Sequence, residues 1–248
     1  MKLPPMKSLC LQTELIFPAF DGEVVDRGDY VLVRTPSNPG FYWGNFLIFR
    51  QPPGRGDFVR WMQIFDREIT HPLKTRHVVF TWDDPRADSG ENCDFLQAGF
   101  WTDDSVILTT DRVHVPREFT AEVEIRLLEG DRDWAAATKN QIEATSEGHV
   151  PGAFEGFKRR QMARYRKMSE LGLGHWFGAF LDDHLVADLG VYVDGPLGRF
   201  QAVCTHPDFK RRGICGPLVN WAAAYAFNHM QVKRLVIAAD EDYHAASL

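Results

Sequence analysis

Short apolar runs alternate with helix-like stretches along the first half of the chain. Two runs rich in β-branched and aromatic residues flank a turn with two prolines and a glycine, which predicts a hairpin or a broken strand. Further on, aromatic residues recur at helical spacing. The elements expected here are strands at 30–34, 41–50, 77–82 and 106–108, and helices at 54–69 and 95–100.

The alternation resumes in the second half after a break. Pro116 and its charged neighbours make 113–119 the best domain boundary, because a fresh alternating strand follows. Asp131 is expected to cap one helix and Pro151 to open another. The expected elements are a strand at 121–128, helices at 131–146 and 151–172, strands at 176–181, 185–193 and 200–205, a helix at 213–230, a strand at 234–239 and the start of a helix at 240–248. This order predicts an α/β (α+β) fold.

Composition places the chain among ordinary globular proteins. Of 248 residues, 44% are apolar and 25% charged, which excludes a mainly disordered or collagen-like chain. No apolar run approaches a membrane span, and the first twenty residues do not read as a signal peptide, so a cytoplasmic protein without membrane partners is expected. The net charge of -6 disfavours nucleic acid as a partner.

Cysteine and histidine spacing gives no sign of a metal site. The four cysteines form no CxxC pair and lie far apart, so free thiols are expected. The nine histidines show no HExxH or other ligand spacing. The sequence therefore predicts no bound metal.

The richest chemical signal is the stretch from Val203 to Gly216, where a strand leads through a basic loop into a helix. Backbone N–H groups at a helix start converge on an anion, and glycine lets a phosphate come close. Basic side chains at a helix start are unfavourable unless an anion is bound, although an ordinary solvated turn is the alternative. The candidate binding residues are Val203, Cys204, Thr205, Lys210, Arg211, Arg212, Gly213, Ile214, Cys215 and Gly216.

This stretch resembles the acyl-CoA-binding motif of the GNAT superfamily of N-acyltransferases. The motif is Arg or Gln, two residues, Gly, one residue, then Gly or Ala, and Lys210, Gly213 and Cys215 stand at its three positions. With the element order, the resemblance covers about residues 120–248 and implies a GNAT-like mixed, mostly antiparallel sheet flanked by helices. It implies that the N–H groups of 211–216 bind the CoA pyrophosphate and that strand 203–205 pairs with the pantetheine.

The same resemblance implies direct transfer of an acetyl group from acetyl-CoA to a primary amine. No covalent enzyme intermediate is then needed, so Cys215 is interpreted as a small helix residue and not as a nucleophile. Residues 242–248 resemble the second CoA-contacting helix, with Asp242 and Ala245 as contacts. The family's tyrosine acid would follow Leu248, and so would two strands. The catalytic acid is therefore unidentified, with Tyr243 and His244 as candidate substitutes. Activity is expected to be impaired, and either the chain is truncated or another segment completes the sheet.

The first half resembles a degenerate copy of the same fold. Gln51, Gly54 and Gly56 fit the loop consensus, but two prolines between them have no N–H to offer, and Phe95 stands where the family has tyrosine. We expect a non-binding half-repeat that buries a sheet edge, the alternative being a proline-rich turn in an unrelated domain. The domains expected are a 1–19 extension, the 20–118 half-domain and a GNAT domain at 119–248.

Basic residues gather on the predicted helix 151–172, as a solvated face or as contacts to an acidic acceptor or the CoA 3′-phosphate. They are Lys158, Arg159, Arg160, Arg164, Arg166 and Lys167. Three functions remain open: an N-acyltransferase acting on a small-molecule or peptide amine, an inactive CoA-binding regulator, and a nucleic-acid module, which the net charge disfavours. The sequence leaves open the acceptor, the acyl chain length, the general base and whether the chain forms a homodimer.

Overall fold

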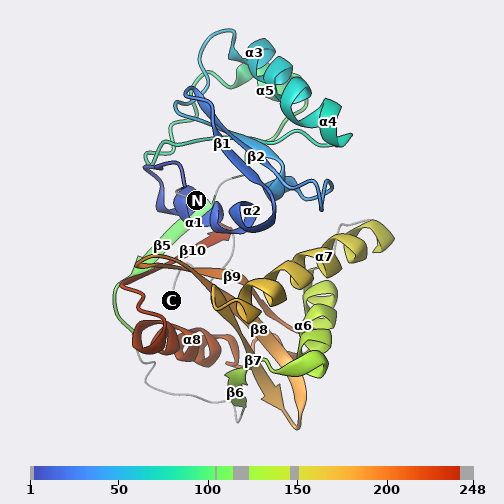
Figure 1. Cartoon of the computed structure of the whole chain (residues 1–248), viewed down its shortest axis with the longest axis vertical. Coiled ribbons are helices and arrows are strands. Elements are labelled where there is room, and N and C mark those ends of the chain that lie inside the picture. The colour runs from blue at the N-terminus through green and yellow to red at the C-terminus, as the bar shows by residue number, and fades with distance from the viewer. Residues whose placement is uncertain (1–2, 104, 114–122, 146–150, 241–248) are drawn as a thin grey trace. The chain divides into compact units, whose positions relative to one another are not determined.

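The computed structural model describes residues 3–103, 105–113, 123–145 and 151–240 (Figure 1). The chain divides into two compact units, the first of Met1–Val106 with Ala239–Leu248, the second of Ile107–Ala238. The boundary predicted between 118 and 119 lies outside the described residues, so the domain division stays a prediction.

The first unit is built on a four-stranded sheet in the order β1-β2-β3-β4. Its strands pair antiparallel, except that β3 and β4 run parallel. The elements are α1 (Leu9–Glu14), α2 (Ile16–Asp21), β1 (Glu23–Asp26), β2 (Tyr30–Arg34), η1 (Tyr42–Gly44), β3 (Phe46–Phe49), α3 (Asp57–Phe65), η2 (Asp66–Thr70), α4 (His71–Leu73), β4 (Phe80–Trp82) and α5 (Cys93–Gln97).

Both faces of this sheet are buried, which explains why β2 and β3 are continuously apolar instead of alternating. Leu32 and Leu47 face one way and pack with Trp61 of α3. Val33 and Ile48 face the other way, in one cluster with Leu11 and other residues near the N-terminus. Helical segments therefore cover the two sides of the sheet.

The strand predicted at 41–50 is shorter than expected, although the hairpin is confirmed by the antiparallel pairing of β2 with β3. Tyr42–Gly44 form a 3₁₀ turn, and β3 starts only at Phe46. The buried Asn45 explains the difference: its Oδ1 accepts from Thr35 N at 2.8 Å, and its Nδ2 donates to Phe41 O at 2.9 Å. These bonds hold the connection between β2 and β3 as a closed loop, so that β3 begins only after Asn45.

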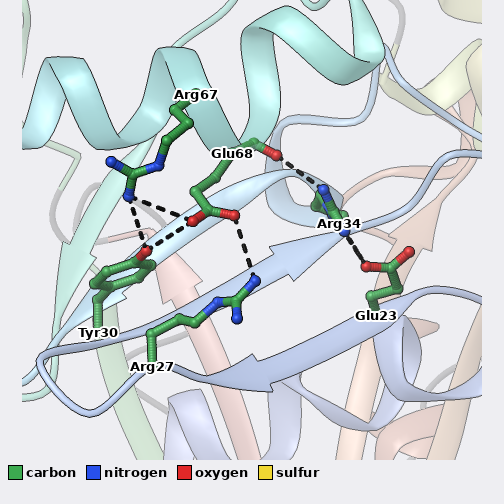
Figure 2. A network of polar contacts seen from close by, with 6 residues as sticks. All are labelled: Glu23, Arg27, Tyr30, Arg34, Arg67 and Glu68. Atoms are coloured by element: carbon green, nitrogen blue, oxygen red, sulfur yellow. Dashed lines mark hydrogen bonds and ion pairs between the residues drawn. The ribbon is translucent and has the colours of Figure 1, made fainter.

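A polar network joins η2 to the sheet (Figure 2). The Glu68 carboxylate is at its centre: it accepts from Tyr30 Oη at 3.0 Å and pairs with Arg27 at 3.6 Å. Arg34 donates to Glu68 O at 3.2 Å and also pairs with Glu23. Residues of β1, β2 and the turn between them thereby fix the π-helical turn that extends α3.

The second unit is built on a six-stranded sheet in the order β5-β10-β9-β8-β7-β6. Strands β6 to β9 pair antiparallel, and β10 runs parallel to β9. The elements are β5 (Ser105–Thr110), β6 (Glu124–Leu127), α6 (Gly130–Thr145), α7 (Pro151–Glu170), β7 (Gly174–Leu181), β8 (His184–Asp194), β9 (Leu197–Thr205), η3 (Pro207–Phe209), α8 (Cys215–His229) and β10 (Arg234–Asp240). The predicted order is confirmed through β10. The last predicted helix, 240–248, lies outside the described residues except for Asp240, which ends β10.

Helices cover both faces of this sheet, with α6 and α7 on one side and α8 on the other (Figure 1). Alternating residues of β7 show the division. Phe177 packs against Trp221 of α8, while Trp176 packs against Trp134 of α6 and Tyr165 of α7. The mixed α/β fold with mostly antiparallel sheets is therefore as predicted.

The prediction that Asp131 caps α6 is wrong. The helix begins one residue earlier, at Gly130, so Asp131 lies in its first turn and pairs with Arg166 of α7 at 2.6 Å. Asp133 bonds the backbone instead, since its Oδ2 accepts from Glu129 N at 2.9 Å, and the same carboxylate pairs with Arg126.

The two sheets share one strand pattern. In each, two antiparallel pairs lead to a strand that is followed by a helix and then by a parallel neighbour: β1-β2-β3-α3-β4 and β7-β8-β9-α8-β10. The first half thus repeats the topology of the second, as the half-repeat interpretation expected. In addition β5, whose residues were assigned to the first half, lies beside β10 in the second sheet.

Candidate functional site

The basic loop lies between the end of β9 at Thr205 and the start of α8 at Cys215. Arg211 and Gly213 both have positive φ, +60° and +74°. Alternating left-handed residues turn successive N–H groups towards one side and make an anion-binding concavity. Within the described part of the chain, no N–H from Arg211 to Gly216 donates to another backbone or side-chain atom.

The surroundings of these N–H groups are open and basic. A Cβ added at Gly216 would meet no described atom within 4 Å. Lys210, Arg211 and Arg212 are exposed, and none pairs with a carboxylate of the described residues. The loop therefore brings together N–H donors without a described acceptor, the positive end of α8 and three cationic side chains. This arrangement is suited to binding a phosphate.

His206 ties this loop to α6 and was missed by the sequence analysis. Its Nδ1 accepts from Asp208 N at 3.2 Å, so the neutral ring carries its proton on Nε2, which lies 3.3 Å from Glu143 Oε2. Its ring meets Phe209 edge-on, and the Arg212 guanidinium lies 4.8 Å from the Phe209 ring centre. This series of contacts, from Glu143 through His206 and Phe209 to Arg212, orients the loop against α6.

Among the described residues, no strand pairs with the outer edge of β9 next to the loop. Pairing with β10 runs from Leu197–Arg234 to Arg199–Val236, and the paired positions end there. Val203 and Thr205 are half-buried, and Cys204 between them is buried. A strand edge with unpaired N–H and C=O groups can accept an added extended chain.

A buried carboxylate lies beneath this part of β9. Asp188 of β8 is fully buried and accepts from Asn140 Nδ2 at 2.6 Å, Gln141 Nε2 at 2.7 Å and Trp176 Nε1 at 2.9 Å. Burial raises the pKa of Asp188 from 3.8 to about 6, although these donors and the Cys204 thiol oppose the shift. The available sequence signal was a single acid inside the otherwise apolar run 185–193.

The basic helix α7 has two different sides. Lys158 and Arg164 are buried, at 8% and 6% exposure, whereas Arg159 and Lys167 are exposed and pair with Glu155 and Glu170. Burial lowers the pKa of Lys158, and the nearby Cys204 and Asp188 partly offset it. The expectation of one solvated basic face is therefore wrong for Lys158 and Arg164, because the inner side of α7 packs against the sheet.

The loop of the first half differs from the loop before α8 in one decisive way. Asp57, the first residue of α3, accepts from Gly54 N at 2.9 Å with its own Oδ2. A carboxylate of the chain thus occupies the helix start, where an anion would otherwise bind. Gly56 supplies the positive φ of +82° before the helix. Phe95 packs in the aromatic core beside Trp61, at 5.4 Å between ring centres.

The remaining predicted site residues divide into two groups. Cys215 begins α8, and burial raises the pKa of its thiol, which disfavours a nucleophilic thiolate. Asp242, Tyr243, His244 and Ala245 lie outside the described residues. None of the described helices is long and apolar enough to cross a membrane.

Residues 142–248 match the model of the Acetyltransferase (GNAT) family. Among solved structures, a functionally unknown conserved protein from Staphylococcus epidermidis is similar, with TM-score 0.70 and 12% identity over 92% of this chain and 87% of that chain. A GCN5-related N-acetyltransferase from Kribbella flavida is similar with TM-score 0.60 and 14% identity over 98% and 99% of the two chains. No curated protein matches the sequence.

Both structural likenesses cover the two sheets, and at such identity they show a shared fold. The near-complete overlap with the Kribbella flavida protein supports an arrangement of two GNAT-like halves. The family match falls on the half that carries the open loop and strand edge. Residues 142–248 thus match the model of the GNAT acetyltransferase family, and the chain has a GNAT-like fold.

Proposed function

We propose that this protein transfers an acetyl group from acetyl-CoA to a primary amine. The observation that carries the proposal is the set of N–H groups from Arg211 to Gly216 at the start of α8, none of which donates to an atom of the described residues. In this role they bind the CoA pyrophosphate, and the exposed cations of the loop add charge. The corresponding loop of the first half, with Asp57 at its helix start, does not bind.

In this proposal, the edge of β9 next to the loop binds the pantetheine part of acetyl-CoA. Val203 and Thr205 pair with the pantetheine amides as an added strand would, which brings the thioester beside β9. The neutral amine attacks the thioester carbon, so that a C–N bond forms and the C–S bond breaks; the nitrogen gives up one proton, and the CoA thiolate takes up one. Holding both reactants in this geometry supplies much of the rate. Tyr243 and His244 stay predicted donors of that proton.

Binding is tested first by thermal melts with and without acetyl-CoA. A ligand that binds only the folded state stabilises it by about 2.7 kcal/mol at a hundredfold excess over its dissociation constant. Gly216→Val should abolish the shift, because the new side chain fills open space at the helix start. Gly152→Val is the matched control, since Gly152 lies in α7 and has equally open surroundings.

Equal acetyl-CoA shifts in both variants would contradict the assignment of the loop. Turnover is tested separately, by release of the CoA thiol with a panel of primary amines. Binding without release would indicate the CoA-binding regulator that the sequence left open.

A further inference from the structure

Strand β9 contains a bulge three residues before its end. Asp188 pairs with Cys204 and Gly190 with Gln201, so Leu189 alone faces both Ala202 and Val203. Ala202 has a φ of +49°, in the left-handed region that residues with a Cβ rarely adopt. Such a conformation persists only where the surrounding structure imposes it.

The side chain that holds this conformation is Gln141 of α6. Its Nε2 donates to Ala202 O at 2.7 Å, to Asp188 Oδ1 at 2.7 Å and to Cys204 Sγ at 3.0 Å. Gln141 is itself buried, at 1% exposure, so its side chain is shielded from water. One amide thus connects the bulge to Asp188 of the neighbouring strand β8 and to Cys204 further along β9.

Asp188 fixes Gln141 in turn. Asn140 Nδ2 donates to its Oδ2 and Trp176 Nε1 to its Oδ1, so the carboxylate is held from α6 and β7 at once. The amide of Gln141 therefore has one orientation in which its N–H groups meet Asp188 and Ala202. Removing the amide would leave the part-buried Ala202 carbonyl without this donor.

The bulge lies where β9 leaves β10. Pairing of the two strands ends at Arg199, and the bulge follows at Ala202, before the half-buried Val203 and Thr205. A bulge bends its strand and increases the local twist. The shape of the open edge therefore depends on the bulge, and the bulge depends on Gln141.

We propose that Gln141 and Asp188 are positioning residues that hold the Ala202 bulge and thereby preform the strand edge for the pantetheine of acetyl-CoA. This inference rests on the proposed function and adds residues that act through the backbone of β9 without contacting the donor. It requires that loss of the Gln141 amide weakens acetyl-CoA binding beyond any loss of stability.

The test is Gln141→Met, which keeps the side-chain volume but removes both N–H donors. Isothermal titration with acetyl-CoA should show an affinity about tenfold weaker, the size expected for one lost hydrogen bond in a preformed site. Adding Ala202→Gly should restore affinity, because glycine adopts the positive φ without strain. Ala135→Met, at an exposed position of α6, is the control and should leave affinity unchanged.

A second measurement does not need the ligand. In the free protein, amide hydrogen exchange at residues 201–205 should be faster in Gln141→Met than in the wild type. It should return to the wild-type rate in the double variant that also carries Ala202→Gly. If Gln141→Met does not fold, Gln141→Asn replaces it, since the shorter side chain withdraws the amide nitrogen from Ala202 O, which now lies 2.7 Å from Nε2.

The outcomes separate the two proposals. A wild-type protein that does not bind acetyl-CoA refutes the proposed function, and the exchange experiment still decides whether Gln141 holds the bulge. A wild-type protein that binds, together with a variant that melts earlier yet binds equally well, overturns the positioning role. The same holds if the Ala202→Gly addition restores nothing.

Discussion

Replacing Asp188 by asparagine should change the pH dependence of stability. In the folded protein this carboxyl is fully buried, and burial raises its pKa to about 6. In the unfolded chain the same group titrates at about 3.9. Asparagine keeps the shape of the side chain and removes the titration, so the variant isolates the contribution of this one proton.

The sign and size follow from the two pKa values. Because the folded state binds the proton more tightly, the contribution of Asp188 to stability is fully present below the unfolded pKa. It is lost as the pH rises through the folded pKa of about 6. A gap of about two units corresponds to roughly 3 kcal/mol between about pH 4 and pH 7.

The assay is urea unfolding of the wild type and of Asp188→Asn at several pH values between these limits. Other groups titrate in both proteins, so their effects cancel in the difference between the two free energies of unfolding. We expect the wild type minus variant difference to fall by roughly 3 kcal/mol from about pH 4 to pH 7.

A difference that is flat or rises with pH would refute this reasoning. It would mean that the amide and indole donors around Asp188 outweigh the loss of hydration and keep the carboxylate charged. The raised pKa would then be wrong, although the hydrogen bonds themselves would stand.

Asp133→Asn should show the opposite trend, because the hydrogen bond from Arg126 lowers the pKa of Asp133. The variant should lose about 2 kcal/mol of unfolding free energy at neutral pH, and this loss should disappear as the pH falls through the lowered pKa. Urea unfolding of this variant against the wild type measures it. Trp61→Ala should cost about 3–5 kcal/mol by emptying the core of the first sheet, where Trp61 is 1% exposed, and calorimetry should show a lower melting temperature. Gly190→Ala should destabilise the second unit, since its Cβ would lie 2.6 Å from the Trp176 ring; a variant with unchanged urea midpoint would show that the ring moves freely.

The strands of the second unit were predictable because polar turns punctuate them. Asp182–Asp183 and Asp194–Gly195 separate three apolar runs, and β7, β8 and β9 begin and end close to those turns. The loop before α8 was predictable for a related reason, since its glycine and three cations are adjacent in the sequence. Local chemistry was sufficient wherever the residues involved are neighbours along the chain.

The contacts between side chains of different helices and strands were not predictable from the sequence. Gln141, Asp188 and Ala202 come from a helix and two strands, and only the packed sheet brings them within hydrogen-bonding distance. Lys158 stands in a charged run that reads as a solvated face, yet it is buried because α7 turns that position towards the sheet. The two cases have one cause: tertiary packing decides which polar residues lie inside.

The position of β5 beside β10 has a consequence for how the chain folds. Nearly half of the protein lies between these two strands in the sequence, yet they are neighbours in one sheet. Contacts between such distant segments require a large loop to close, and they slow folding. During synthesis β5 leaves the ribosome long before its partner exists, with its edge unpaired. Pairing of β5 with β10 should therefore be a late event in folding.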